Sequence, residues 1–216
     1  MIREKLFVTG IGTGVGKTVC SAVLARYFEA DYWKPVQSGD LHYTDSMTIK
    51  DLTGNDVFCH RETYRLKLAA SPHQSGAEEG ICINTDDFSL PETQRSLIVE
   101  GAGGLMVPLS DRELIIDLIE KLDLAVALVV KNYLGCINHS LLSIMAINQR
   151  ELQLKYLILN GDFPEDTERV ICSYVSIETT IIRIPDLDPP TKENIEKTAL
   201  DLFNKYKPQR HKSFLP

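Results

Sequence analysis

The stretch Leu6-Phe7-Val8-Thr9-Gly10-Ile11-Gly12-Thr13-Gly14-Val15-Gly16-Lys17-Thr18 leads from a short apolar segment through a glycine-rich turn into a helical pattern. A strand, a glycine-rich turn and a helix in this order predict a phosphate-binding loop. Backbone N–H groups of such a loop point at one anion, and the helix N-terminus adds partial positive charge. We therefore expect Lys17 to reach the β- and γ-phosphates of a nucleotide and Thr18 to hold Mg²⁺.

The spacing of this loop departs from the common pattern G-x-x-x-x-G-K-[ST]. That pattern requires a glycine at position 11, where this chain has Ile11. Partitioning and targeting ATPases carry a further lysine in the loop, which reaches across a dimer, and this chain has Gly12 in that place. The loop indicates a nucleotide-binding protein outside that group, and a glycine-rich turn without a nucleotide is the alternative.

Beyond the loop, short apolar segments alternate with helical patterns. Most of these segments are continuously apolar, which is typical of strands buried on both faces of a parallel sheet. The expected strands are Leu6–Thr9, Tyr32–Pro35, Ser96–Glu100, Ala125–Val130, Tyr156–Asn160 and Thr180–Ile184. The expected helices are Gly16–Glu29, Asp45–Leu52, Arg112–Leu122, His139–Glu151, Glu165–Tyr174 and Lys192–Tyr206. The alternation predicts an α/β fold with a doubly wound, mostly parallel sheet flanked by helices, of the P-loop NTPase type.

Composition and linker content bound the architecture and the class of partner. The 216 residues contain no linker rich in Gly, Ser or Pro, so we expect a single domain over residues 1–216, with little sheet in residues 54–93. The net charge of -7 disfavours nucleic acid or an anionic membrane as the main partner. The longest apolar run, Leu124 to Val130, is far shorter than the ~20 residues of a membrane span. Five scattered cysteines and the absence of a signal-peptide pattern favour a cytoplasmic protein.

Polar and glycine-rich residues follow several of the expected strands. Lys34–Gly39 follows the second strand and Glu100–Gly104 the third, while Lys131–His139 and Asn160–Asp162 follow the next two. In a doubly wound fold the carboxyl ends of the strands meet at one edge, where ligands bind. The sequence therefore predicts one ligand site built from these segments and the phosphate loop.

Three of these side chains and Asp45, at the start of the next expected helix, suggest chemistry, and for Lys34, Glu100 and Asp45 a simpler explanation exists. Lys34 could stabilise a phosphate or a carboxylate formed during the reaction, and Ser38 could hydrogen-bond the substrate; a solvated surface lysine is the alternative. Glu100 could bind Mg²⁺, or it could be an exposed turn residue. Asp45 could be only the N-cap of its helix. Together with Thr18 and Glu100 it would complete an oxygen set suited to Mg²⁺.

The segment Leu134–Ser140 precedes the helix expected at His139. A helix N-terminus in this position could receive a carboxylate of the substrate. Asn138 could take part in that binding, or it could be only the N-cap of the helix.

In combination these residues resemble the dethiobiotin synthetases, the ATP-dependent carboxylases of biotin synthesis. The P-loop alone is generic, but the joint occurrence of several motifs in family order is specific. The spacing from Gly10 to Gly16 is that of the family. The matching segments are Val8–Gly10, Val15–Thr18, Lys34–Val36, Ser38–Gly39, Ser71-Pro72-His73, Glu100–Gly104 and Leu134–His139.

The resemblance implies a reaction in which ATP and Mg²⁺ drive the carboxylation of 7,8-diaminopelargonic acid. One amine captures CO₂, supplied from bicarbonate, as a carbamate, which attacks the γ-phosphate of ATP. The second amine then closes the ureido ring of dethiobiotin, and ADP and phosphate are released. Each step produces or moves negative charge, so we expect catalysis by positioning and electrostatic stabilisation.

The resemblance also assigns roles by position, and it implies a homodimer with the substrate site at its interface. Catalysis would fall to Lys17 and Lys34, and Mg²⁺ binding to Thr18, Asp45 and Glu100. The nucleotide would contact Gly12, Thr13, Gly14, Val15, Gly16, Lys17, Thr18, Val19, Glu100, Gly101, Ala102, Gly103, Asn160 and Gly161. The diamine substrate would contact Ser38, Gly103, Gly104, Leu134, Gly135 and Asn138.

Three features depart from the family pattern. The stretch from Lys34 to Asp45 is shorter than usual, and the segment after Pro185-Asp186-Leu187 is trimmed. Asn160-Gly161 stands where the family often has Asn-Arg, so an arginine that stacks near the purine is missing. We therefore expect tolerance of other nucleoside triphosphates.

Three other functions stay open on the residues alone. A small-metabolite kinase usually has a lid rich in arginine, and the sequence shows no arginine cluster. A switching ATPase that works through a protein partner would need the lysine that is missing at Gly12, and it would gain nothing from Lys34 and Ser38. A plain nucleotide-binding module is the third alternative.

Overall fold

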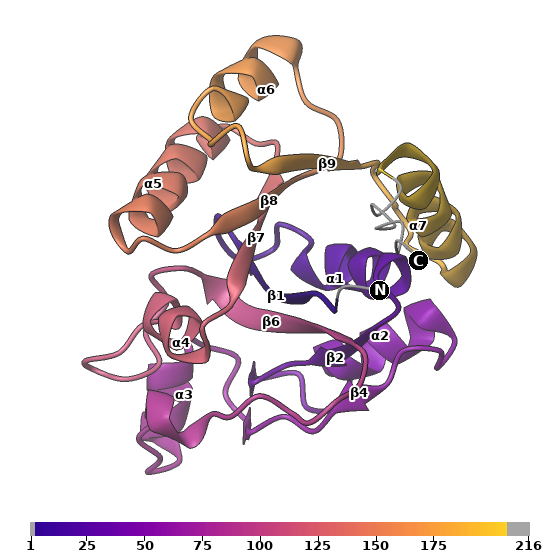
Figure 1. Cartoon of the computed structure of the whole chain (residues 1–216). Helices are drawn as coiled ribbons and strands as arrows, with labels where there is room; N and C mark the ends of the chain where they lie inside the picture. The colour runs from indigo at the N-terminus through magenta and orange to yellow at the C-terminus, as the bar shows by residue number, and fades with distance from the viewer. Residues whose placement is uncertain (1–2, 207–216) are drawn as a thin grey trace, which may run out of the picture.

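A seven-stranded parallel sheet forms the centre of the computed structural model, which describes residues 3–206. Its strands, in spatial order, are β4 (Cys59–His60), β2 (Ala30–Trp33), β6 (Ser96–Gly104), β1 (Lys5–Gly10), β7 (Ala125–Lys131), β8 (Leu154–Asn160) and β9 (Thr180–Ile184). The chain turns to one side of β1 after the first strand and to the other side after β6 (Figure 1). The sheet is therefore doubly wound, and the phosphate loop leaves β1 where the winding direction changes.

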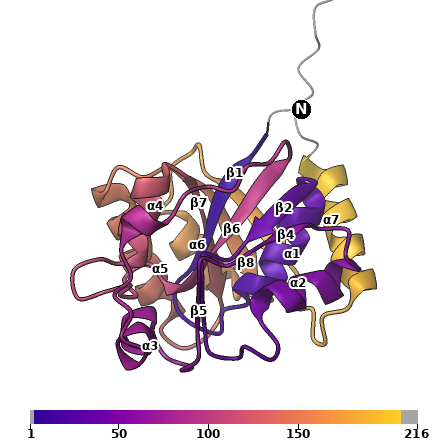
Figure 2. The same cartoon turned by 90° about the horizontal axis from the view of Figure 1, so that it is seen from below.

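Helices cover both faces of the sheet. One layer contains α1 (Lys17–Tyr27), α2 (Asp45–Thr53) and α7 (Lys192–Tyr206), and the other contains α4 (Ile115–Leu122), α5 (Cys136–Gln149) and α6 (Glu165–Cys172) (Figure 2). Because both faces are covered, the central strands β1, β6 and β7 are almost wholly buried and apolar. Within residues 3–206, no helix has the length and apolarity needed to span a membrane.

The predicted fold class is confirmed, and all six expected strands are present. The prediction of little sheet in residues 54–93 is confirmed, because this region contributes only the two residues of β4 and the three of β5 (Tyr64–Leu66), which pairs with β3 (Val36–Ser38) in a separate two-stranded sheet. It also contains α3 (Pro72–Glu78) and the 3₁₀ helix η1 (Thr85–Asp87). Strands of two or three residues are too short for a periodic pattern to reveal. The expected domain over residues 1–216 extends past the described residues at both ends and stays a prediction.

Several element boundaries differ from the expected ones for local reasons. The second strand ends at Trp33 and not at Pro35, since proline has no N–H to donate to a ladder. The third strand continues beyond Glu100 to Gly104, where it pairs with Gly10. The fifth helix, α5, begins at Cys136 and not at His139. The other expected helices agree with the structure to within three residues at each end.

Candidate active site

In the phosphate loop, the side chain of Lys17 bonds to the backbone of the loop itself. Lys17 Nζ donates a hydrogen bond to the carbonyl oxygen of Gly12 at 3.0 Å. Gly16 lies at the N-cap of α1 with φ of 85°, a conformation that favours glycine. The side-chain amide of Asn160 donates to the carbonyl oxygen of Val15 at 2.9 Å, and a Cβ on Gly16 would lie only 2.2 Å from that amide nitrogen. Asn160, at the end of β8, therefore braces the loop.

Burial dominates the electrostatics of Lys17. The pKa of this ammonium is lowered from 10.5 to about 8, mainly by burial; the charge of Glu100 opposes the shift and the charge of Lys34 adds to it. Removal from water disfavours a charged amine unless an anion compensates it. Lys17 is thus prepared to bind an anion that enters the loop.

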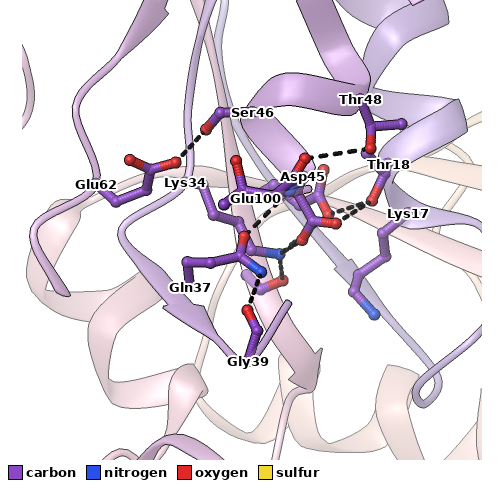
Figure 3. Close-up of polar contacts among 12 residues, drawn as sticks. Lys17, Thr18, Lys34, Gln37, Gly39, Asp45, Ser46, Thr48, Glu62 and Glu100 are labelled. Atoms are coloured by element: carbon purple, nitrogen blue, oxygen red, sulfur yellow. Dashed lines mark hydrogen bonds and ion pairs between the residues drawn. The ribbon is translucent and has the colours of Figure 1, made fainter. Parts of the chain in front are cut away.

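Lys34 lies at the centre of a buried ionic cluster. Only 4% of the residue is exposed, so the alternative of a solvated surface lysine is wrong. Its Nζ lies 2.6 Å from Asp45 Oδ2, 3.1 Å from Glu100 Oε1 and 3.1 Å from the carbonyl oxygen of Gly101 (Figure 3). Burial alone would lower the pKa of Lys34, but the charges of Glu100 and Asp45 outweigh it and raise the pKa. The ammonium therefore keeps its proton.

Glu100 is the acceptor that joins this cluster to the phosphate loop. It is 1% exposed within β6, so the alternative of an exposed turn residue is wrong. Its Oε1 lies 3.0 Å from Thr18 Oγ1 as well as near Lys34, and its Oε2 accepts a hydrogen bond from the Tyr32 hydroxyl at 2.9 Å. Both oxygens of the buried carboxylate are thus paired, as a buried charge requires.

Asp45 occupies the first position of α2, and the cap of that helix is Thr44, whose side chain accepts from Met47 N. The alternative of Asp45 as the N-cap is therefore wrong. Gln37 accepts a hydrogen bond from Asp45 N at 3.2 Å and donates one to the carbonyl oxygen of Gly39 at 3.1 Å. Burial would raise the pKa of Asp45, but the charge of Lys34 and the hydrogen bonds from Lys34 and Thr18 together outweigh it and lower the pKa. The short segment after Lys34 still brings this carboxylate into the cluster.

The oxygen atoms of Thr18, Asp45 and Glu100 fit a magnesium ion. Thr18 Oγ1 lies 3.2 Å from Asp45 Oδ1 and 3.0 Å from Glu100 Oε1, so the three side chains converge (Figure 3). Residues 3–206 contain no cluster of three or more His, Cys, Asp and Glu side chains that could hold a metal alone. Two carboxylates and a hydroxyl suit Mg²⁺, which keeps waters and takes further ligands from phosphates.

Ser38, at the end of β3, carries a buried hydroxyl without a hydrogen-bond partner among the described residues. The following Gly39 has φ of 77°, and a Cβ there would lie 2.4 Å from Ala69 Cα, which brings the segment before α3 against β3. In that segment Ser71 Oγ lies 2.9 Å from His73 Nδ1. The hydrogen-bonding capacity of the Ser38 hydroxyl is therefore unused among the described residues.

The glycines after Glu100 lie in β6 beside the phosphate loop. A Cβ on Gly104 would lie 3.1 Å from the carbonyl oxygen of Gly10, so the two backbones approach closely. Gly103 has φ of 69°, and a Cβ there would lie 3.6 Å from Thr13 Oγ1. The structure thus brings these glycines to the loop, as the strand order predicted.

The start of α5 lies in a more open part of the same edge. Gly135 is its N-cap with φ of 105°, so the alternative of Asn138 as the N-cap is wrong. Leu134 and Asn138 are exposed, and no hydrogen bond or ion pair among the described residues joins them to Lys34 or Glu100. The exposed apolar side chains of this region are Tyr133, Leu134, Leu142 and Met145.

Two residues of the site escaped the sequence-based predictions. Tyr32 and Gln37 contact Glu100 and Asp45, yet neither residue type suggests catalysis by itself. One signal was available for Tyr32, because alternate residues of an extended strand share a face and Tyr32 is two positions before Lys34. Gln37 gave no comparable signal, since its partner Asp45 lies across a turn.

Comparisons with known proteins agree with this geometry. The family described as an AAA domain matches residues 4–194. An ATP-dependent dethiobiotin synthetase BioD of Cytophaga hutchinsonii is 41% identical over 206 residues, which cover 94% of this chain and 98% of that protein. A second, from Christiangramia forsetii, is 42% identical over 203 residues, with 94% and 97% covered. The chain belongs to the dethiobiotin synthetase family.

Membership of the dethiobiotin synthetase family confirms the resemblance and the prediction of an ATP-dependent ligase of the P-loop class. It sets aside the kinase, switching-ATPase and binding-module alternatives. Among solved structures, the MinC:MinD cell division protein complex of Aquifex aeolicus is similar with a TM-score of 0.49 and 14% identity, over 93% of this chain and 96% of that one. A likeness this distant carries no information on substrate or partner.

Proposed function

We propose that this protein makes dethiobiotin from 7,8-diaminopelargonic acid, CO₂ and ATP in an Mg²⁺-dependent reaction. The observation that carries the proposal is the buried ammonium of Lys34, 2.6 Å from Asp45 Oδ2 and 3.1 Å from Glu100 Oε1, beside the phosphate loop. The loop already has Lys17 for the phosphates of a nucleotide. A second buried cation beside it suits a second anion, and a carbamate is the anion that this reaction produces.

The reaction needs stabilisation of negative charge at each step. One amine attacks CO₂ and loses a proton, which gives a carbamate. A carbamate oxygen attacks the γ-phosphorus of ATP, ADP leaves, and a carbamic–phosphoric anhydride forms. The second amine attacks the carbonyl carbon and loses a proton, the bond from that carbon to the phosphate oxygen breaks, and phosphate leaves as the ureido ring closes. Fixed positive groups that face these charges lower the barriers.

The two lysines divide this work. Lys17 contacts the phosphate oxygens, whose charge stabilises the protonated form of this amine and raises its pKa from about 8. Lys34 would face the carbamate from its fixed place beside Asp45 and Glu100. Thr18, Asp45 and Glu100 would hold Mg²⁺, which supplies Lewis-acid stabilisation of the triphosphate charge.

The diamine head binds at the unpaired hydroxyl of Ser38 and at the backbone of Gly103 and Gly104. Its carboxylate binds at the N-terminus of α5, at Leu134–Gly135 and Asn138 of a second copy of the chain. A helix N-terminus attracts a carboxylate through its free N–H groups. The exposed apolar side chains around Leu134 support the homodimer that this arrangement requires.

The nucleotide lies along Gly12–Val19 and Glu100–Gly103, with its base near Asn160-Gly161. No arginine stands at Gly161 to stack on a purine, so we expect GTP and CTP to replace ATP in part. All five cysteines, which lie within the described residues, are free thiols, and this supports a cytoplasmic location.

The proposal is tested by incubating the purified protein with 7,8-diaminopelargonic acid, bicarbonate, Mg²⁺ and ATP and detecting dethiobiotin by mass spectrometry. We expect product with the native chain and at least about a thousandfold less with Lys34→Ala. Parallel reactions with GTP and CTP measure base tolerance, and a strong preference for ATP would contradict that part. Absence of product with every triphosphate would overturn the proposed function.

A further inference from the structure

Tyr32 contacts the proposed metal site from inside the sheet. It lies in β2, where it pairs with Ile98 of β6, two residues before Glu100. The side chain is fully buried, and its hydroxyl donates to Glu100 Oε2 at 2.9 Å. The proposed reaction gives this contact no role.

The two oxygens of Glu100 have separate partners. Oε1 lies 3.0 Å from Thr18 Oγ1 and 3.1 Å from Lys34 Nζ, whereas the partner of Oε2 is Tyr32. A carboxylate turns as a rigid group, so the phenol that holds Oε2 also fixes the direction of Oε1. Glu100 therefore presents one oxygen to the phosphate loop and keeps the other in the sheet.

The phenol of Tyr32 is a hydrogen-bond donor to Glu100. The tyrosine hydroxyl has a single proton to donate, and the acceptor of that proton is Glu100 Oε2 at 2.9 Å. Because β2 is flanked by β4 and β6 and buried along its length, Tyr32 reaches Glu100 from within the sheet.

We infer that Tyr32 is a positioning residue which restricts Glu100 to a single metal-facing oxygen and so makes the site select Mg²⁺ over Ca²⁺. The inference rests on the proposed function, which assigns Glu100 as a metal ligand. Ca²⁺ takes six to eight oxygens and readily accepts both oxygens of one carboxylate. Mg²⁺ is smaller, keeps its waters and uses single oxygens in octahedral geometry. A carboxylate with one oxygen already occupied suits Mg²⁺.

The test measures ADP binding to the full chain by calorimetry in the presence of either Mg²⁺ or Ca²⁺, without turnover. In Tyr32→Phe only the hydroxyl is lost, and Glu100 Oε2 becomes free to turn toward the metal. We expect Mg²⁺-supported ADP affinity to fall about tenfold, the effect of one lost hydrogen bond to a charged group. Ca²⁺-supported affinity changes little or rises, so the ratio between the two metals shifts.

Tyr64→Phe is the matched control. It removes a hydroxyl that donates to Asp87 at 2.6 Å on the surface and has no contact with Glu100. We expect its metal ratio to equal that of the native chain. An unchanged ratio in Tyr32→Phe would overturn the inference, and so would equal weakening with both metals, which indicates general damage. A native chain that binds no ADP with Mg²⁺ would overturn the proposed function as well.

Discussion

The two halves of the ligand-binding edge differ in how completely their side chains are paired. In the half formed by β1, β2, β6 and α2, Lys34, Asp45 and Glu100 are joined at 2.6 to 3.1 Å, and Lys34 and Glu100 are almost fully buried. In the half formed by the start of α5, Leu134 is fully exposed and Asn138 is exposed as well.

The difference indicates whether the side chains of each half are paired within one chain or left to pair with another molecule. Groups that act on charge must be held in place before the reaction, and one chain supplies all of that cluster. Groups that recognise the far end of a substrate need no partner within their own chain, because a second copy of the chain or the substrate itself can supply it. We therefore expect changes in the paired half to affect chemistry, and changes in the open half to affect substrate affinity and assembly.

The largest expected effect follows from Lys34→Ala. Product formation should fall by at least about a thousandfold, because a buried charge facing the reacting groups is lost. Mg²⁺-supported ADP binding should persist or tighten, since Asp45 and Glu100 no longer have an ammonium between them. Rapid-quench product assays and calorimetry measure the two quantities.

Lys197→Ala is the control for this change, since Lys197 is an exposed lysine on α7, outside the segments of the proposed site. Its activity should equal that of the native chain. Retained activity in Lys34→Ala would contradict a catalytic role for the cluster of Lys34, Asp45 and Glu100.

A smaller effect, about ten- to fiftyfold, is expected from Leu134→Asp in the open half. A charge on an exposed apolar surface opposes its burial against a second copy. The KM for the diamine should rise and the dimer should dissociate in sedimentation experiments, while ADP binding stays constant. Leu200→Asp, on the exposed face of α7, should change neither property. A Leu134→Asp chain that stays dimeric and keeps its KM would contradict the division into two halves.

The third prediction concerns pH and the paired half. Lys17 has a pKa of about 8 in the free protein, and bound phosphates raise it. Binding of ADP above this pH therefore requires uptake of a proton, so affinity falls by up to about tenfold per pH unit. Below about pH 7 the affinity should be flat with respect to Lys17, because the amine is already protonated. Calorimetry in buffers of different ionisation enthalpy detects the proton, and in Lys17→Arg the pH dependence should disappear.

The smallest effect is expected from Asn160→Ala, at the border between the two halves. The lost bond to the Val15 carbonyl loosens the phosphate loop, and ADP affinity should fall about fivefold, as for one neutral hydrogen bond. The kcat should change less than the affinity. A loss of a hundredfold or more would mean that Asn160 does more than brace the loop.

Local patterns predicted the parts of this site that lie at the ends of strands. Lys17 follows a strand and a glycine turn, and Lys34 and Glu100 each come near a strand end, so a parallel sheet alone brings them together. The bonds of Tyr32 and Gln37 could not be predicted in this way, because they depend on strand neighbours and turn geometry. The start of α5 was also missed, because a glycine with φ of 105° replaced the polar N-cap that the pattern suggested.

The measurement that tests the central claim most directly follows oxygen from bicarbonate into phosphate. In the anhydride route one carbamate oxygen becomes bonded to phosphorus and leaves with it when the ring closes. With ¹⁸O-labelled bicarbonate and a reaction faster than exchange with water, we predict one labelled oxygen in each released phosphate and one dethiobiotin per phosphate. Unlabelled phosphate, or phosphate without dethiobiotin, would mean that water attacks ATP and would contradict the account.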